Sequence, residues 1–75
     1  MANMKTVVIT GAAGGMGSAT ATLFKSKGYQ VLGTDRGEIA GVDFQVVGDV
    51  ADEVTWQKIS AVIDKNKLEV SSLIN

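Results

Sequence analysis

A glycine-rich stretch near the amino terminus constrains the fold of this chain more than any other feature. Four of the nine glycines lie within the eight residues Thr10–Gly17. The β-branched run Val7–Ile9 precedes this stretch, and a helical pattern of apolar residues follows it. A strand, a glycine turn and a helix in this order let an anion approach bare backbone N–H groups at the positive helix start. The stretch therefore predicts a strand–turn–helix unit that binds the pyrophosphate of a dinucleotide.

Composition excludes several other classes of protein. The chain has 75 residues, enough for one small domain, and no cysteine or histidine, which argues against a disulfide framework and the usual zinc sites. The formal net charge is −1 and the lysines are scattered, so nucleic acid is not an expected partner. No apolar run approaches the roughly 20 residues of a membrane span, and no secretion signal is evident. We therefore expect a cytoplasmic protein with no metal and no membrane partner.

The hydrophobic pattern predicts strands over residues 5–10, 29–34, 44–47 and 70–75, with helices after the first and third strands. The order is β-α-β-β-α-β, and a helical turn over residues 37–42 is an open alternative for the middle connection. Strands that alternate with helices favour an α/β fold with a parallel sheet between two helical layers. Right-handed crossovers then give a Rossmann-type half of about four strands in the order 3-2-1-4, with the glycine turn at the switch point.

Two residues are expected to delimit the helices: Gly28 as the glycine that ends the first helix and Asp52 as the N-cap of the second. The apolar spacing predicts which side chains are buried. In the first helix these are Met16, Ala19, Leu23 and Phe24. In the second helix they are Val54, Trp56, Ile59, Val62 and Ile63.

The spacing of the glycines distinguishes between known phosphate loops. A Walker A loop needs a lysine, and the stretch from Val7 to Phe24 has none. The common Gly-x-Gly-x-x-Gly fingerprint also fails, because Ala13 stands at its second glycine. The pattern that fits is Thr-Gly-x-x-x-Gly-x-Gly, beginning at Thr10.

With this pattern the chain resembles the short-chain dehydrogenase/reductase family, whose cofactor loop has that spacing directly after the first strand. The resemblance runs over all 75 residues. Asp35 ends the second strand, Asp49-Val50 follows the third, and Leu73-Ile74-Asn75 is similar to the start of the family motif Asn-Asn-Ala-Gly. The resemblance implies an NAD(P)-binding domain of an enzyme that interconverts alcohols and ketones.

The family has a plain branch of reductases and an extended branch of epimerases and dehydratases. Gly14 makes the loop satisfy the spacings of both branches. The ending Leu73–Asn75 and the short span between the second and third strands favour the plain branch. An extended-branch enzyme that uses bound NAD is one alternative, and a regulator that senses a dinucleotide without catalysis is another.

Asp35 lies 24 residues after Gly11, close to the distance expected for an acid that binds a ribose. Its carboxylate can accept hydrogen bonds from both adenosine ribose hydroxyls of NAD. Facing the 2′-phosphate of NADP at about 4 Å, with an effective dielectric constant near 20, it would be repelled by about 4 kcal/mol per charge pair. Asp35 therefore predicts NAD rather than NADP, although the neighbouring Arg36 could offset a phosphate.

The resemblance also implies roles for the other candidate residues. Asp49 accepts a hydrogen bond from the adenine amino group, Val50 covers the ring, and the Asn75 backbone lies near the adenosine ribose. The Met16 N–H faces the pyrophosphate, and its side chain is expected only to pack. The full set of expected cofactor-binding residues is Gly11, Ala13, Gly14, Gly15, Met16, Gly17, Asp35, Arg36, Asp49, Val50 and Asn75.

No catalytic residue is predicted within the chain. The resemblance implies a catalytic serine and a Tyr-x-x-x-Lys pair, whereas the single tyrosine, Tyr29, is followed four residues later by Gly33. We therefore expect residues 1–75 to be a partial NAD(P)-binding domain that ends within its fourth strand. The open edge of that strand is expected to promote self-association, and the full-length parent is expected to be a homo-oligomer.

Overall fold

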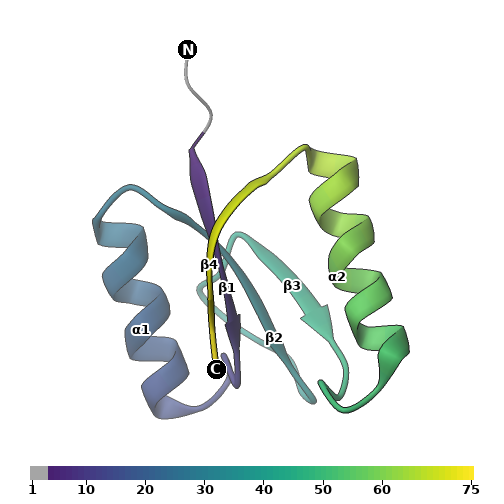
Figure 1. Cartoon of the computed structure of the whole chain (residues 1–75). Helices are drawn as coiled ribbons and strands as arrows, with labels where there is room; N and C mark the ends of the chain where they lie inside the picture. Colours follow the sequence, from purple (N-terminus) through teal and green to yellow (C-terminus); the bar gives the residue numbers. More distant parts are fainter. Residues whose placement is uncertain (1–3) are drawn as a thin grey trace.

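The computed structural model describes residues 4–75 as a four-stranded parallel sheet with a helix on each face (Figure 1). The elements in chain order are β1 (Lys5–Thr10), α1 (Gly15–Ser26), β2 (Gln30–Asp35), β3 (Phe44–Val47), α2 (Glu53–Asn66) and β4 (Glu69–Ile74). The strand order is β3-β2-β1-β4. The sequence-based prediction of an α/β, Rossmann-type half with order 3-2-1-4 is confirmed.

The central strand β1 is covered on both faces. Successive side chains of a strand point to opposite faces, so Val7 and Ile9 enter one core while Val8 enters the other. All three are at most 3% exposed. A strand buried in this way needs an apolar residue at every position, which explains why its sequence shows a continuous run instead of an alternation.

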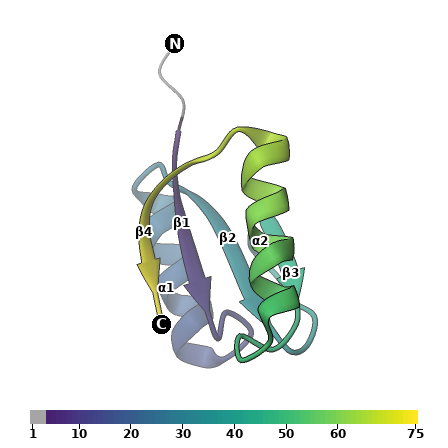
Figure 2. The same ribbon diagram turned by 45° about the vertical axis from the view of Figure 1, so that its right-hand side comes forward.

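The two cores make the molecule three layers thick (Figure 2). The core on the α1 side of the sheet consists of Val7, Ile9, Ala12, Ala21, Val31 and Ile39. The core on the α2 side consists of Val8, Leu32, Val46 and Ile59, with Trp56 and Phe44 packed against it.

The connection between β2 and β3 contains no helix, so the alternative of a helical turn over residues 37–42 is wrong. Ile39, only 5% exposed, fills the space that such a turn would cover. Gly33 makes this packing possible, because a Cβ there would lie 2.9 Å from the Ala12 Cβ and 3.0 Å from Val42 Cγ1. An extended loop therefore reaches the sheet over a strand position that has no side chain.

The buried side of α2 differs from the predicted one at its first turn. Val54 is 58% exposed, whereas its neighbour Thr55 is 3% exposed. The cause is the turn after β3, where a Cβ on Gly48 would overlap Thr55 Oγ1. The small residue of the turn and the short threonine side chain pack together, which rotates Val54 out to solvent. Ile59, as predicted, is buried.

The predicted apolar stripe of α1 is also largely wrong. Met16 is 88% exposed, Leu23 is 51% exposed and Ala19 is exposed, while Ala21 is the buried residue of the helix. Phe24 is half-buried and meets Tyr29 edge-to-face, with ring centroids 5.3 Å apart. The helix packs against the sheet through the small residue Ala21, so its backbone lies close to the strands. The larger side chains of Met16 and Leu23 are exposed to solvent.

The helix ends follow capping rules to different degrees. Gly28, with φ +88°, ends α1 as predicted, and the N–H of Tyr29 donates to the Phe24 carbonyl at 3.1 Å. Asp52 is the N-cap residue of α2, but its side chain makes no capping hydrogen bond. Lys67 follows α2 in the left-handed region with φ 52° and ψ 48°, a conformation that favours glycine.

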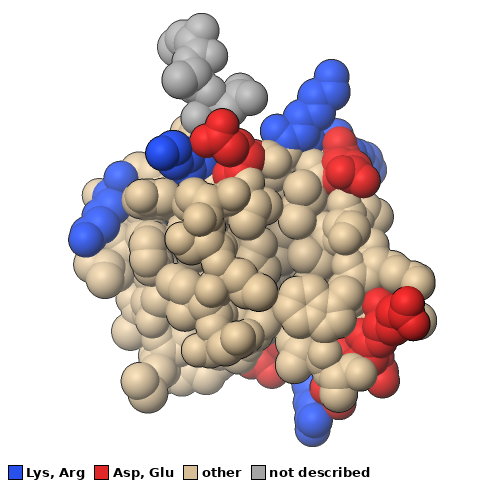
Figure 3. Space-filling view, viewed as in Figure 1, with Lys and Arg blue, Asp and Glu red and all other residues tan. Residues whose placement is uncertain are grey.

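The edge strand β4 pairs only with β1 in the described part of the chain. Val70 and Leu73 of β4 are 41% and 50% exposed. In the space-filling view, charged side chains lie around the margins, and the middle of this face shows no charge (Figure 3).

Of the helices found over residues 4–75, neither is long and apolar enough to cross a membrane.

Candidate functional site

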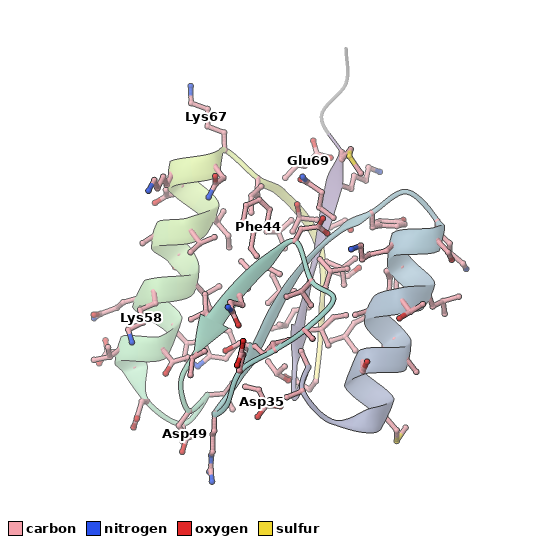
Figure 4. The ribbon with its side chains drawn as sticks, turned by 180° about the vertical axis from the view of Figure 1, so that it is seen from behind. Asp35, Phe44, Asp49, Lys58, Lys67 and Glu69 are labelled. Carbon is pink, nitrogen blue, oxygen red and sulfur yellow. The ribbon has the colours of Figure 1, made fainter. Side chains whose placement is uncertain are left out.

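The predicted site residues lie at the carboxyl ends of the strands, the edge at which both helices begin (Figure 1). The glycine loop follows β1, Asp35 is the last residue of β2 and Arg36 follows it, and Asp49 follows β3. Because all four strands are parallel, these ends meet on one side of the sheet. Asp35 and Asp49 accordingly lie at the same end of the molecule, opposite Lys67 and Glu69 (Figure 4).

The glycine loop is a tight turn tied to the neighbouring strand. Gly11 has φ +68°, which only glycine adopts readily, and its carbonyl accepts a hydrogen bond from the Gly14 N–H at 3.2 Å. The Ala12 N–H donates to the Thr34 carbonyl of β2, also at 3.2 Å. Backbone bonds thus hold both the start and the middle of the loop.

Gly17 is the point where the helix touches this loop. A Cβ at Gly17 would overlap the Gly11 carbonyl oxygen and lie 2.9 Å from the Ala12 Cα. By contrast, a Cβ at Gly15 meets nothing within 4 Å. The last glycine of the motif is therefore required by the close packing of α1 on the loop.

The first turn of α1 presents unpaired backbone donors. Gly14 is the N-cap residue, and its carbonyl accepts from the Ser18 N–H at 2.8 Å. The N–H groups of Gly15, Met16 and Gly17 have no acceptor one helical turn earlier. Unpaired donors at the positive end of a helix dipole suit an anion, which makes this turn a candidate anion site. The Met16 side chain, expected to pack, is 88% exposed beside this site, which corrects that expectation.

The Asp35 carboxylate is oriented by two backbone donors. Its Oδ2 accepts from the Ala13 N–H at 2.9 Å, and its Oδ1 accepts from the Arg36 N–H at 2.7 Å. The first bond joins the end of β2 to the glycine loop across 22 residues of sequence. Asp35 therefore holds the loop in position, a role in addition to the one predicted for it.

Arg36 and Asp49 form an ion pair across the ends of β2 and β3. Arg36 Nη2 lies 3.0 Å from Asp49 Oδ2, and the two side chains are 78% and 33% exposed. The other carboxylate oxygen of Asp49 accepts from the Ala51 N–H at 2.9 Å, which shapes the turn into α2. The Val50 carbonyl accepts from Trp56 Nε1 at 2.7 Å, so the same turn is also anchored to α2.

Two clefts lie on either side of the glycine loop. The smaller, of about 150 Å³, is lined by Gly11, Asp35, Arg36, Gly48, Asp49 and Val50. The larger, of about 430 Å³, is lined by Ile9, Thr10, Gly11, Met16, Gly17, Thr20, Ile74 and Asn75. Gly11 borders both, so a ligand that lies over the loop can extend into each cleft.

The structure brings most of the predicted residues to these clefts, but not all. Ala13, Gly14 and Gly15 line neither, and lie in the loop and the first turn of α1 between them. Asn75 borders the larger cleft, where its Oδ1 accepts from the Thr10 hydroxyl at 3.0 Å.

Sequence reasoning did not select Thr20 and Gly48 as site residues. Thr20 lines the larger cleft one helical turn beyond Met16, a spacing that could have indicated it. Gly48 lines the smaller cleft because Thr55 packs against it, a contact with no signal in the sequence.

The model of the NAD dependent epimerase/dehydratase family matches residues 7–68. This chain belongs to that family. The match runs from β1 through the glycine loop and both acids to the end of α2. The family's cofactor is a nicotinamide dinucleotide. The structure fits such a ligand, because open amides lie at the start of α1 and the Cβ positions of Gly11 and Gly15 beside them are empty, with no other atom within 4 Å.

Two curated relatives extend the comparison. The chain is 30% identical over 79 residues to serine 3-dehydrogenase of Agrobacterium fabrum (strain C58 / ATCC 33970). It is 32% identical, also over 79 residues, to serine 3-dehydrogenase of Rhizobium radiobacter. Each alignment covers 93% of this chain and 32% of the relative. The chain thus spans about a third of the length of these relatives.

Proposed function

We propose that this chain is the NAD-binding part of a short-chain oxidoreductase of the plain branch, an enzyme that interconverts an alcohol and a carbonyl. The observation that supports this most directly is the hydrogen bond between the Asp35 carboxylate and the Ala13 N–H. It keeps a ribose-binding acid and a pyrophosphate-binding loop in one fixed arrangement. In this proposal residues 1–75 form the first part of a longer Rossmann domain.

The pyrophosphate binds over the glycine loop. Its oxygens accept hydrogen bonds from the N–H groups of Gly15, Met16 and Gly17, where the helix dipole adds a favourable charge. Gly11 and Gly14 leave the backbone uncovered on this side of the loop. The larger cleft receives the ribose and nicotinamide side of the ligand. Because Asn75 borders this cleft, the proposal puts it on the nicotinamide side and not near the adenosine ribose, where the family resemblance leads us to expect it.

The adenosine binds in the smaller cleft. Asp35 retains acceptor capacity for ribose hydroxyls, since each carboxylate oxygen accepts only one backbone bond in the structure. Asp49 accepts from the adenine amino group, and Val50, 42% exposed, covers the ring. A 2′-phosphate in this cleft meets two carboxylates, so NAD is the preferred cofactor.

Two named functions are compatible with the comparisons. The serine 3-dehydrogenase relatives favour a dehydrogenase that oxidises a hydroxyl group. The family model is compatible with a second candidate, an NAD-dependent epimerase or dehydratase. In the first case we propose that the catalytic serine and the Tyr-x-x-x-Lys pair are supplied by sequence outside these 75 residues, and that the whole enzyme is a cytoplasmic homo-oligomer.

The experiment that tests the proposal is calorimetric titration of the chain with NAD, NADP and ADP-ribose. NAD and ADP-ribose should bind with similar affinity, and NADP should bind about 10- to 100-fold more weakly. In Asp35→Asn, which keeps one acceptor for the Ala13 N–H, that gap should narrow. Equal affinities of the wild-type chain for NAD and NADP would contradict the cofactor assignment, and no binding of any of the three would contradict the proposal as a whole.

A further inference from the structure

Arg36 is the one cationic side chain that lines the smaller cleft within the described part of the chain. It directly follows Asp35 and is 78% exposed, so a free Arg36 side chain could turn toward a phosphate on the adenosine ribose. A guanidinium recognises phosphate with several directed donors. An unrestrained arginine at this position would therefore favour NADP.

The structure does not leave Arg36 unrestrained. Its Nη2 lies 3.0 Å from Asp49 Oδ2, in the one ion pair found among residues 4–75. The partner is Asp49 and not the adjacent Asp35, whose carboxylate oxygens accept the backbone N–H groups of Ala13 and Arg36. The guanidinium is consequently directed toward Asp49, which follows β3.

We propose that Asp49 is a positioning residue that determines cofactor specificity by keeping Arg36 away from the 2′ position of the adenosine ribose. This inference rests on the proposed NAD-binding function. Asp35 repels a 2′-phosphate directly, whereas Asp49 acts on the same phosphate by pairing with Arg36, the one cationic side chain that lines this cleft in residues 4–75.

The charges in the cleft explain why both acids are needed. Asp35, Asp49 and Arg36 together carry one net negative charge, and a 2′-phosphate adds nearly two more. If Asp49 carried no charge, no ion pair would hold Arg36, and its guanidinium could turn toward the phosphate. Loss of the Asp49 charge both frees the guanidinium and removes one repelling carboxylate.

Asp49→Asn tests this without disturbing the turn. The asparagine oxygen can still accept from the Ala51 N–H, a bond that Asp49 makes at 2.9 Å. The matched control is Asp52→Asn, which removes the same charge from the N-cap of α2, where the side chain makes no capping hydrogen bond. A second variant, Asp49→Ser, keeps a local acceptor and serves if the asparagine variant fails to fold.

Each variant is titrated with NAD and NADP, and the ratio of the two dissociation constants is compared. The ratio should shift toward NADP by about tenfold in Asp49→Asn and by much less in Asp52→Asn. The shift should shrink at high salt, because the charges are exposed. Weaker binding of both cofactors by the same factor would mean only an adenine contact and would overturn the inference.

The decisive measurement is a double-mutant cycle with Arg36→Gln. If Asp49 acts through Arg36, then Asp49→Asn should shift the ratio clearly less in the Arg36→Gln background than in the wild-type background, and the remaining shift measures the direct repulsion by Asp49. The same shift with and without Arg36 would overturn the positioning role. If the wild-type chain binds neither cofactor, the proposed function fails together with this inference. If it binds NAD and the ratio stays constant, this inference alone fails.

Discussion

Single atoms decide how the glycine loop is built. The Gly11 carbonyl receives the Gly14 N–H on one side and is approached by Gly17 on the other. No side chain fits at Gly17, because its Cβ would occupy the space of that carbonyl oxygen. The motif therefore contains two kinds of glycine: Gly11 for its left-handed backbone, and Gly17 for close packing.

The variant Gly17→Ala should separate packing from helix propensity. The added methyl group must push α1 away from the loop, so we expect a loss of stability of about 1–3 kcal/mol, as for other overpacked sites. Urea denaturation followed by circular dichroism measures it. Gly15→Ala is the matched control, because its Cβ meets nothing and alanine favours the helix by up to about 1 kcal/mol. Equal effects of the two changes would contradict the packing explanation.

At the scale of the elements, the end of α2 has a residue other than glycine in a backbone conformation that favours glycine. Lys67 has a left-handed backbone, yet the Leu68 N–H still donates to the Ile63 carbonyl at 3.0 Å as in a glycine-ended helix. α1 ends in the same way with Gly28, which adopts this conformation without strain. Both helices thus end at a residue in the left-handed conformation, but only α1 has glycine, the residue that favours this conformation, at that position.

We expect Lys67→Gly to stabilise the chain by about 0.5–1 kcal/mol, because glycine relieves the left-handed backbone at the cost of some unfolded-state entropy. The midpoint of urea denaturation should rise. Lys65→Gly is the control: it lies inside the last turn of α2, and glycine there should cost up to about 1 kcal/mol. A lower midpoint for Lys67→Gly would refute the explanation.

The open edge of β4 is a second feature at this scale. An exposed strand edge offers unpaired backbone groups to another chain. Sedimentation velocity of the 75-residue chain should therefore show association that grows with concentration, and Leu73→Lys should weaken it about tenfold. Leu23→Lys on α1 is the control, since Leu23 is 51% exposed and Leu73 is 50% exposed. A monomer at all concentrations, or an equal effect of both changes, would contradict this prediction.

At the scale of the whole molecule, the parallel sheet gathers the site from distant segments. The loop after β1, Asp35 after β2 and Asp49 after β3 meet because every strand ends on the same side. Two clefts, of about 430 and 150 Å³, flank the loop. The fold therefore gathers the candidate site at one edge of the sheet, and in the proposed function the acids select among ligands.

The sequence by itself determined the layers, the strand order and the place of the glycine loop. The elements and the loop follow from local signals such as the apolar run Val7–Ile9, the glycine spacing and Gly28, because each depends on neighbouring residues alone. The strand order follows from these elements and the right-handed crossover between parallel strands. Only the tertiary structure decided the partners of the polar atoms: Asp35 with the Ala13 N–H, and Arg36 with Asp49. It also decided that Thr55 is buried instead of Val54. Such contacts join segments far apart in the chain, and their geometry depends on packing distances that no local pattern encodes.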